Sequence, residues 1–299
     1  MADDEHTYIP RRAAKFSTVQ LRGITHRIAC WGKVDGDPVL LLHGFLDTCE
    51  TYQFLVDEFS DGWNFLALDW RGFGDSARNG GPYWFPDYLA DLDALINLLA
   101  ATRPLRVVGH SMGGNVAALY AGVRPEKIRA VVSLEGFGLP RLQIDTAPQR
   151  YAKWLEQVQA APPVSRYDSV ELFAGVLQRR NSRLTPARAR FLAAAWTRTC
   201  AAGGVELRAD PWHRLVNPQL YRREEAEACW RAFPGPVQMV LAEESDFRAR
   251  LGDDADDAAC SRSYQRLTLV RIAGVGHMMH HENPALVAAT IQPFLQRHP

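Results

Sequence analysis

The sequence predicts a doubly wound α/β fold, in which helices cover both faces of a mostly parallel sheet. Short, fully apolar runs alternate with segments of helical periodicity, the pattern typical of strands and helices joined by crossovers. The alternation breaks once, between about residues 138 and 232, and then resumes. Polar or glycine-rich turns follow several of the apolar runs, as expected where a sheet builds a site at the carboxyl ends of its strands.

The first half of the chain supplies most of the predicted sheet. Residues 19–31 predict an edge hairpin. Four short apolar runs predict buried parallel strands, at 38–42, 63–68, 105–108 and 130–134. Helices are expected at 52–59, from 86 to about 99 with Pro86 in a favoured first-turn position, and directly after Ser111.

The second half predicts an insertion and then the end of the same sheet. Helices are expected at 139–154, 169–180 and 186–199, strands at 236–242 and 267–272, and a closing helix at 284–297. We therefore expect residues 1–137 and 233–299 to form one α/β core and residues 138–232 to form a helical cap. The alternative is a set of extra helices beside the sheet with no role as a lid, although long structured insertions near site loops are often lids.

Composition narrows the function classes. The 34 basic and 34 acidic side chains balance, which gives no indication of nucleic acid or an acidic membrane as a partner. Residues 1–6 are acidic and polar, unlike a signal peptide, and no apolar run approaches the roughly 18–20 residues that span a bilayer. The five cysteines are scattered without a CxxC pair and indicate neither a disulfide framework nor a zinc site. A cytoplasmic protein with reduced thiols is the expectation.

The pentapeptide Gly109-His110-Ser111-Met112-Gly113 carries the strongest chemical signal. It follows an apolar strand and precedes a small-residue helix, the context of a nucleophile elbow. So sharp a turn brings neighbouring backbone very close, and glycines at 109 and 113 remove the Cβ atoms that would clash. The alternative is a glycine-rich turn whose serine is idle.

The turn His43-Gly44-Phe45 follows the first core strand and predicts an oxyanion-binding loop. A tetrahedral intermediate needs two donors, and the backbone amides of Phe45 and Met112 are the candidates. Substrate is expected to contact four further residues around the turn, the elbow and the start of the 86–99 helix: His43, Gly44, His110 and Trp84.

A base and an acid are expected after the later strands. His277 lies in a Gly-Val-Gly-His turn just past the last strand, with His280 and His281 as competitors for the role. Asp246, four residues past the strand that ends at Ala242, is the predicted acid, because the chain order Ser, Asp, His matches the motif. Three glutamates remain alternatives: Glu135, which directly follows a strand, Glu243 and Glu244.

With these motifs the sequence resembles the α/β-hydrolase superfamily over nearly its whole length. The resemblance rests on His43-Gly44, the Asp69–Ser76 loop of the form D-x-R-G-x-G-x-S, Gly109–Gly114, and Gly276-His277. Many relatives carry Gly-Glu-x-Asp after the acid strand, where this chain has Glu243 in place of the glycine. Epoxide hydrolases and haloalkane dehalogenases of this superfamily have an aspartate at the elbow, so Ser111 argues against both.

The resemblance implies hydrolysis of a small-molecule carboxylic ester through an acyl-enzyme, with no metal or organic cofactor. Two alternatives stay open. One is a C–C bond hydrolase of the meta-cleavage type. Relatives of that type often have a tryptophan directly after the active-site histidine, where this chain has Met278. The other is a non-catalytic ligand-binding member of the fold. A homodimer is also an open alternative.

Overall fold

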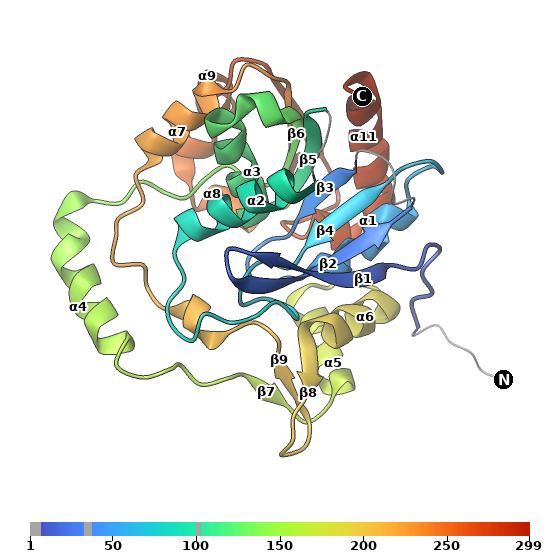
Figure 1. Cartoon of the computed structure of the whole chain (residues 1–299), viewed down its shortest axis with the longest axis vertical. Helices are drawn as coiled ribbons and strands as arrows, with labels where there is room; N and C mark the ends of the chain where they lie inside the picture. Colours follow the sequence, from blue (N-terminus) through green and yellow to red (C-terminus); the bar gives the residue numbers. More distant parts are fainter. Residues whose placement is uncertain (1–6, 33–37, 100–102) are drawn as a thin grey trace.

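The computed structural model describes residues 7–32, 38–99 and 103–299 (Figure 1). The acidic segment 1–6, which we interpreted above as lacking a signal peptide, lies outside the described residues. Among the described residues, no helix has both the length and the apolar character needed to cross a membrane.

An eight-stranded sheet forms the centre of the molecule, in the order β1-β2-β4-β3-β5-β6-β10-β11. Its strands are β1 (Lys15–Leu21), β2 (Ile24–Trp31), β3 (Val39–Leu42), β4 (Phe65–Leu68), β5 (Leu105–His110), β6 (Ile128–Leu134), β10 (Val237–Ala242) and β11 (Leu267–Ile272). β1 and β2 form the predicted antiparallel hairpin and β2 is antiparallel to β4, whereas the remaining pairs are parallel. The predicted fold class is confirmed.

Helices cover both faces of this sheet (Figure 1). One face carries α2 (Phe85–Leu99), α3 (Met112–Val123), α7 (Arg223–Ala232) and α9 (Asp257–Arg262), and the other carries α1 (Gln53–Asp57), α10 (Met279–Glu282) and α11 (Pro284–Arg297). Side chains alternate along the strands, so that Leu40 and Leu42 of β3 join the first core and Val39 and Leu41 join the second. Burial on both sides explains why β3 is apolar throughout.

The strand order places a topological switch point between β3 and β5. The chain runs from β3 to β4 on one side and then crosses to β5 on the other side of β3. Crevices at such points, outside the carboxyl ends of the strands, are the usual binding sites of open α/β sheets. The Gly44 turn and Ser111 follow these two strands.

The segment between β6 and β10 is only partly the set of helices that the sequence predicts. It contains α4 (Ala147–Gln157), α5 (Val170–Arg180), α6 (Pro186–Trp196) and a small sheet in the order β7-β9-β8, from β7 (Arg166–Tyr167), β8 (Thr197–Thr199) and β9 (Val205–Leu207). This small sheet was not predicted. The expected helix 186–199 ends at Trp196 because the β-branched Thr197 and Thr199 pair with β9.

Two helices of this segment, α4 and α7 (Arg223–Ala232), differ in how closely they pack against the α/β core. α4 begins at Ala147, later than predicted, and lies away from the sheet on long connections (Figure 1). α7 instead packs on the sheet, where Ala226 and Trp230 join the first core and the Trp230 ring stacks on Tyr264 at 5.6 Å. The helical layer of the core therefore includes α7, although the predicted boundary at 232 assigned it to the cap.

Candidate active site

Ser111 stands in a strained turn between β5 and α3. Its φ of 50° and ψ of −114° lie in a region that residues with a side chain rarely adopt. A Cβ on Gly113 would lie 1.9 Å from the Leu42 carbonyl oxygen, and one on Gly109 would lie 2.4 Å from that of Gly113. These close approaches explain the two glycines of the motif, and the half-buried Ser111 is held at the carboxyl edge of the sheet.

The Gly44 turn lies directly against the elbow. A Cβ on Gly44 would lie 2.7 Å from His110 Nδ1 and 3.3 Å from Ser111 Cβ, so only glycine allows this contact. Phe45 follows with a side chain that is 48% exposed. Met112 is the first residue of α3, where backbone amides have no acceptor within the helix. Of the two predicted oxyanion donors, Met112 follows Ser111 in the chain, and Phe45 follows the Gly44 turn that packs against Ser111.

His43, a predicted substrate contact, is fully buried and bonded to protein on both ring nitrogens. The Trp70 amide donates to its Nε2 at 3.0 Å, and its Nδ1 donates to the Gly44 carbonyl at 2.8 Å. Burial lowers the pKa of His43, which keeps the ring neutral. The ring therefore supports the turn from within and has no free nitrogen for a substrate.

His277 is paired with Glu135, which follows β6. Its Nδ1 lies 3.2 Å from Glu135 Oε2, and the same oxygen accepts from Ser245 Oγ at 2.5 Å. The other carboxylate oxygen accepts from the Ala242 amide at 2.9 Å, and Glu135 has no exposed surface. A carboxylate on Nδ1 fixes the imidazole tautomer and leaves Nε2 as the basic nitrogen.

Glu135 lies in an unusual turn. Its φ is 56°, and Ser133 Oγ both donates to the Gly136 carbonyl at 2.9 Å and accepts from the Gly136 amide at 3.2 Å. Left-handed backbone costs free energy for a residue with a side chain and is commonly found at functional sites. Ser133 thus stabilises the turn that holds the carboxylate.

Asp246, the predicted acid, has no hydrogen bond or ion pair with His277 among the described residues. It begins α8 (Asp246–Ala249) and is exposed, as are Glu243 and Glu244. In the part of the chain that the structure describes, the carboxylate bonded to His277 is that of Glu135. β6 and β10 are adjacent in the sheet, and the corner after β6 buries the Glu135 carboxylate beside the histidine turn.

The turn around His277 is held by residues that sequence reasoning missed. Glu282 accepts from the Gly276 amide at 2.6 Å and from Asn181 Nδ2 at 2.8 Å, which ties the turn to the inserted segment. The ring of Phe247 stacks on His277 at 4.5 Å. Glu282 lies two residues before the proline that begins α11, in a run of polar residues, but nothing in that pattern indicates its partner.

His280 and His281, the competing bases, lie away from Glu135 and near Asp47. Both are buried, and their Nε2 atoms are 3.7 Å and 3.4 Å from Asp47 Oδ2. Burial lowers the pKa of His280 to about 3. His110 is also buried and its Nε2 donates to the His277 carbonyl at 2.8 Å, so it contacts the site through the backbone.

Aromatic side chains surround the site. Trp84, just before α2, is half-buried with its ring 6.4 Å from that of Trp154 in α4. His213 is stacked between Phe73 and Tyr83, each at 3.7 Å, and lies 6.2 Å from the exposed Phe45 ring. These contacts come from both the core and the inserted segment.

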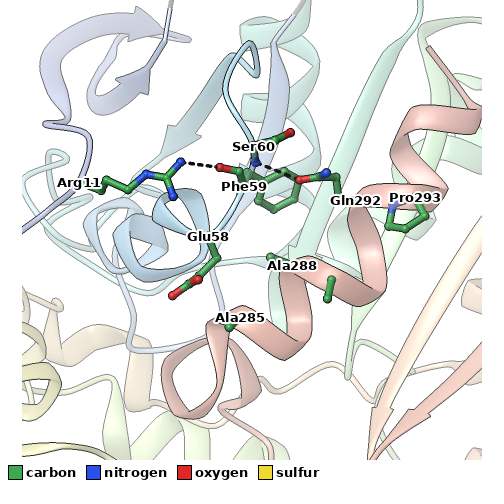
Figure 2. Close-up of a pocket in the computed structure, with 9 residues that line it drawn as sticks. Arg11, Glu58, Phe59, Ser60, Ala285, Ala288, Gln292 and Pro293 are labelled. Carbon is green, nitrogen blue, oxygen red and sulfur yellow. Dashed lines mark hydrogen bonds between the residues drawn. The ribbon is translucent and has the colours of Figure 1, made fainter.

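Two cavities of the described structure can be compared with the positions of Ser111 and His277. One of about 100 Å³ is lined by Leu46, Asp47 and Trp196 and lies between the Gly44 turn and the inserted segment. A larger hollow of about 340 Å³ lies between the end of α1 and α11 and is lined by Glu58, Ser60 and other residues that Figure 2 shows. Neither lining includes Ser111 or His277, so we assign neither cavity to the reacting groups.

Known proteins agree with this architecture. A serine hydrolase-like protein of Danio rerio is 30% identical over 275 residues, which cover 89% of this chain and 83% of that protein. The 2-(acetamidomethylene)succinate hydrolase of Mesorhizobium japonicum is 24% identical over 88% of this chain and 89% of its own length. The thioesterase domain from the curacin biosynthetic pathway superposes with a TM-score of 0.84 at 24% identity, covering 94% of this chain and 99% of that domain.

The sheet order, the elbow and the relatives lead to one assignment. The model of the alpha/beta hydrolase fold family matches residues 37–284. Residues 37–284 include the Gly44 turn, the elbow and the His277 turn. The chain therefore belongs to the alpha/beta hydrolase fold family.

Proposed function

We propose that this protein is a serine hydrolase that cleaves carboxylic esters through an acyl-enzyme. Ser111 is the nucleophile, His277 the general base and Glu135 the carboxylate that orients it. The observation that carries the proposal is the bond between His277 Nδ1 and a fully buried Glu135, at the same sheet edge as a strained elbow serine. The serine hydrolase-like relative supports the same reaction class.

In the proposed reaction, protons and electron pairs move between named groups at each step. His277 Nε2 takes the proton from Ser111 Oγ as that oxygen attacks the acyl carbonyl. The Phe45 and Met112 amides donate to the oxyanion, and Glu135 stabilises the imidazolium. His277 then gives the proton to the departing alcohol. Water, activated by the same nitrogen, hydrolyses the acyl-enzyme and regenerates Ser111.

The inserted segment supplies the cover in this proposal. Trp196 at the end of α6 donates through Nε1 to Asp47 at 2.8 Å, and α5 and α6 pack against Phe54 of α1. These contacts anchor residues 138–222 beside the Gly44 turn. Trp84 and Trp154, whose rings lie 6.4 Å apart, are the proposed aromatic contacts of the acyl group.

The experiment is hydrolysis of p-nitrophenyl esters from acetyl to long acyl chains, together with acyl thioesters as a second acyl class. Wild type is compared with Ser111→Ala and with Ser60→Ala, a matched control in an exposed loop. We expect wild type and Ser60→Ala to turn over alike and Ser111→Ala to lose at least about 10⁴-fold in kcat/KM. Mass spectrometry after a fluorophosphonate should place one adduct on Ser111.

Two results would contradict the proposal. If Ser111→Ala retains wild-type activity, the nucleophile lies elsewhere. If folded wild type hydrolyses none of these substrates and forms no fluorophosphonate adduct, a C–C hydrolase or a ligand-binding protein becomes the better interpretation. Ring-cleavage products and ligand-dependent shifts in melting temperature then separate those two.

A further inference from the structure

Asp47 lies just past the Gly44 turn, and the two oxygens of its carboxylate have very different hydrogen-bonding surroundings. Oδ1 accepts three hydrogen bonds, from the Thr48 amide at 2.8 Å, Thr51 Oγ1 at 2.7 Å and Trp196 Nε1 at 2.8 Å. Oδ2 has no hydrogen-bond partner among the described residues, and the side chain is 1% exposed. A buried carboxylate oxygen without a donor costs free energy, so an occupant is expected.

Three buried histidines surround that oxygen with unpartnered nitrogens. Both nitrogens of His280, Nδ1 of His110 and Nε2 of His281 lack hydrogen bonds in the described part of the chain. The rings of His110 and His280 lie 4.3 Å apart, and those of His280 and His281 lie 4.0 Å apart. The two Nε2 atoms of His280 and His281 lie 3.7 Å and 3.4 Å from this oxygen, and the further unpartnered nitrogens of the three rings add to the available ligand atoms.

The geometry of the set suits a small divalent ion. One ligand atom each from Asp47, His110 and His280 all lie within 4.8 Å of one another. Tetrahedral ligands at the Zn–N and Zn–O distances of about 2.0–2.2 Å are about 3.4 Å apart, so a shift of about 1 Å or less per side chain closes the site. His280 Nε2 is already 3.7 Å from Asp47 Oδ2.

The surrounding contacts orient the ligands as metal sites require. His110 Nε2 donates to the His277 carbonyl, which leaves the Nδ1 lone pair free for an ion. The three donors on Asp47 Oδ1 hold the carboxylate with Oδ2 toward the imidazoles. A ring N–H on a backbone carbonyl and a hydrogen-bonded carboxylate are the usual supports of metal ligands. Burial also lowers the pKa of His110 and His280, and the neutral imidazole is the ligating form.

We propose that Asp47, His110 and His280 bind a transition-metal ion of the Zn²⁺ class, with His281 beside the same carboxylate oxygen. The ion lies behind the Gly44 turn and joins three segments: the turn, the elbow strand and the helix after His277. The cavity of about 100 Å³ that Asp47 and Trp196 line provides the approach. The site uses none of the reacting groups and stands independently of the proposed function.

The His26–Asp91 pair provides an internal control. It is also a fully buried histidine–carboxylate pair, with His26 Nε2 at 3.3 Å from Asp91 Oδ2. Here the pair is saturated, because His26 Nδ1 bonds to the Ile24 carbonyl and Arg71 donates to both oxygens of Asp91. The same residue types therefore offer no vacant ligand atom at this second place.

The experiment is calorimetric titration of the chelator-treated full-length protein with Zn²⁺, and with Co²⁺ followed by visible absorption. Wild type and His26→Gln should bind one ion per chain with equal affinity and show the d–d bands of a low-coordinate Co²⁺ site. His280→Gln and Asp47→Asn should each bind at least about tenfold more weakly. Circular dichroism checks that each variant is folded.

X-ray absorption on Zn²⁺-loaded wild type tests the site without any variant, in case the substitutions prevent folding. A shell of nitrogen and oxygen ligands with two imidazole signals supports the proposal. It is overturned if wild type binds no stoichiometric ion, if His280→Gln and wild type bind alike, or if the shell contains cysteine sulfur.

Discussion

The corners that follow β6 and β10 are neighbours at one edge of the sheet, and their acidic side chains have opposite surroundings. After β6, Glu135 is completely buried and bonded to His277, Ser245 and the Ala242 amide. After β10, Glu243, Glu244 and Asp246 are exposed, and Glu244 pairs with Arg183. A carboxylate at a strand end is therefore not enough; its burial and bonding decide which one can orient the histidine.

The β10 corner nevertheless takes part in holding the β6 carboxylate. Ser245 and the Ala242 amide, both at the end of β10, donate to Glu135. One corner thus contributes the charge and the other contributes the donors that fix it. In the proposed mechanism, this division places the acid one strand away from the position that the motif order predicts.

The largest effect is expected for Glu135→Gln. Loss of the negative charge removes both the tautomer control and the stabilisation of the imidazolium, which costs about 10⁴-fold in kcat/KM. Ester hydrolysis at saturating and limiting substrate measures it, with the melting temperature as the check on folding. A loss of less than tenfold in a folded variant would mean that a carboxylate after β10, and not Glu135, orients His277.

Moving the carboxylate between the corners should restore part of the activity. Ser245 Oγ lies 2.5 Å from the Glu135 oxygen that His277 contacts, so Glu135→Ala combined with Ser245→Asp places a new carboxylate near His277. We expect kcat/KM about tenfold or more above that of Glu135→Ala alone. The matched control is Glu135→Ala with Ser245→Asn, which has the same shape and no charge. Equal activity of the two double variants would count against the exchange.

Ser245→Ala should have a smaller effect. The variant removes one hydrogen bond to a charged acceptor and leaves the Ala242 amide and His277 in place. Loss of about 1.4 kcal/mol of transition-state stabilisation corresponds to about tenfold in kcat/KM. The pH–rate profile is the second readout, because a looser Glu135 stabilises the imidazolium less and should move the acidic limb downward in pH. An unchanged profile and rate would leave Ser245 without a positioning role.

The smallest effect is expected for Asp246→Asn. The side chain is exposed at the start of α8 and screened by water, so the change in kcat/KM should stay within about twofold. The same assay measures it beside Glu135→Gln. A loss of more than a hundredfold would show that Asp246, and not Glu135, supports His277.

Local sequence patterns were enough to predict the sheet, the elbow turn and the histidine turn. These features are local: apolar runs with the period of strands, glycines where backbone must approach within the width of a Cβ, and a histidine after a strand. The family resemblance and the positions of Ser111, Phe45, Met112 and His277 followed from such patterns alone. Each needs only a few neighbouring residues to be recognised.

Which side chains contact one another depends on how distant segments pack. The pairing of Glu135 with His277 spans 142 residues and depends on β6 and β10 being adjacent, and the Asp47–His110–His280 cluster joins three distant segments. The small sheet β7-β9-β8 and the packing of α7 on the core are likewise set by burial against distant chain. No local pattern records these contacts, because hydrogen-bond partners and buried surfaces are chosen by strand order and packing.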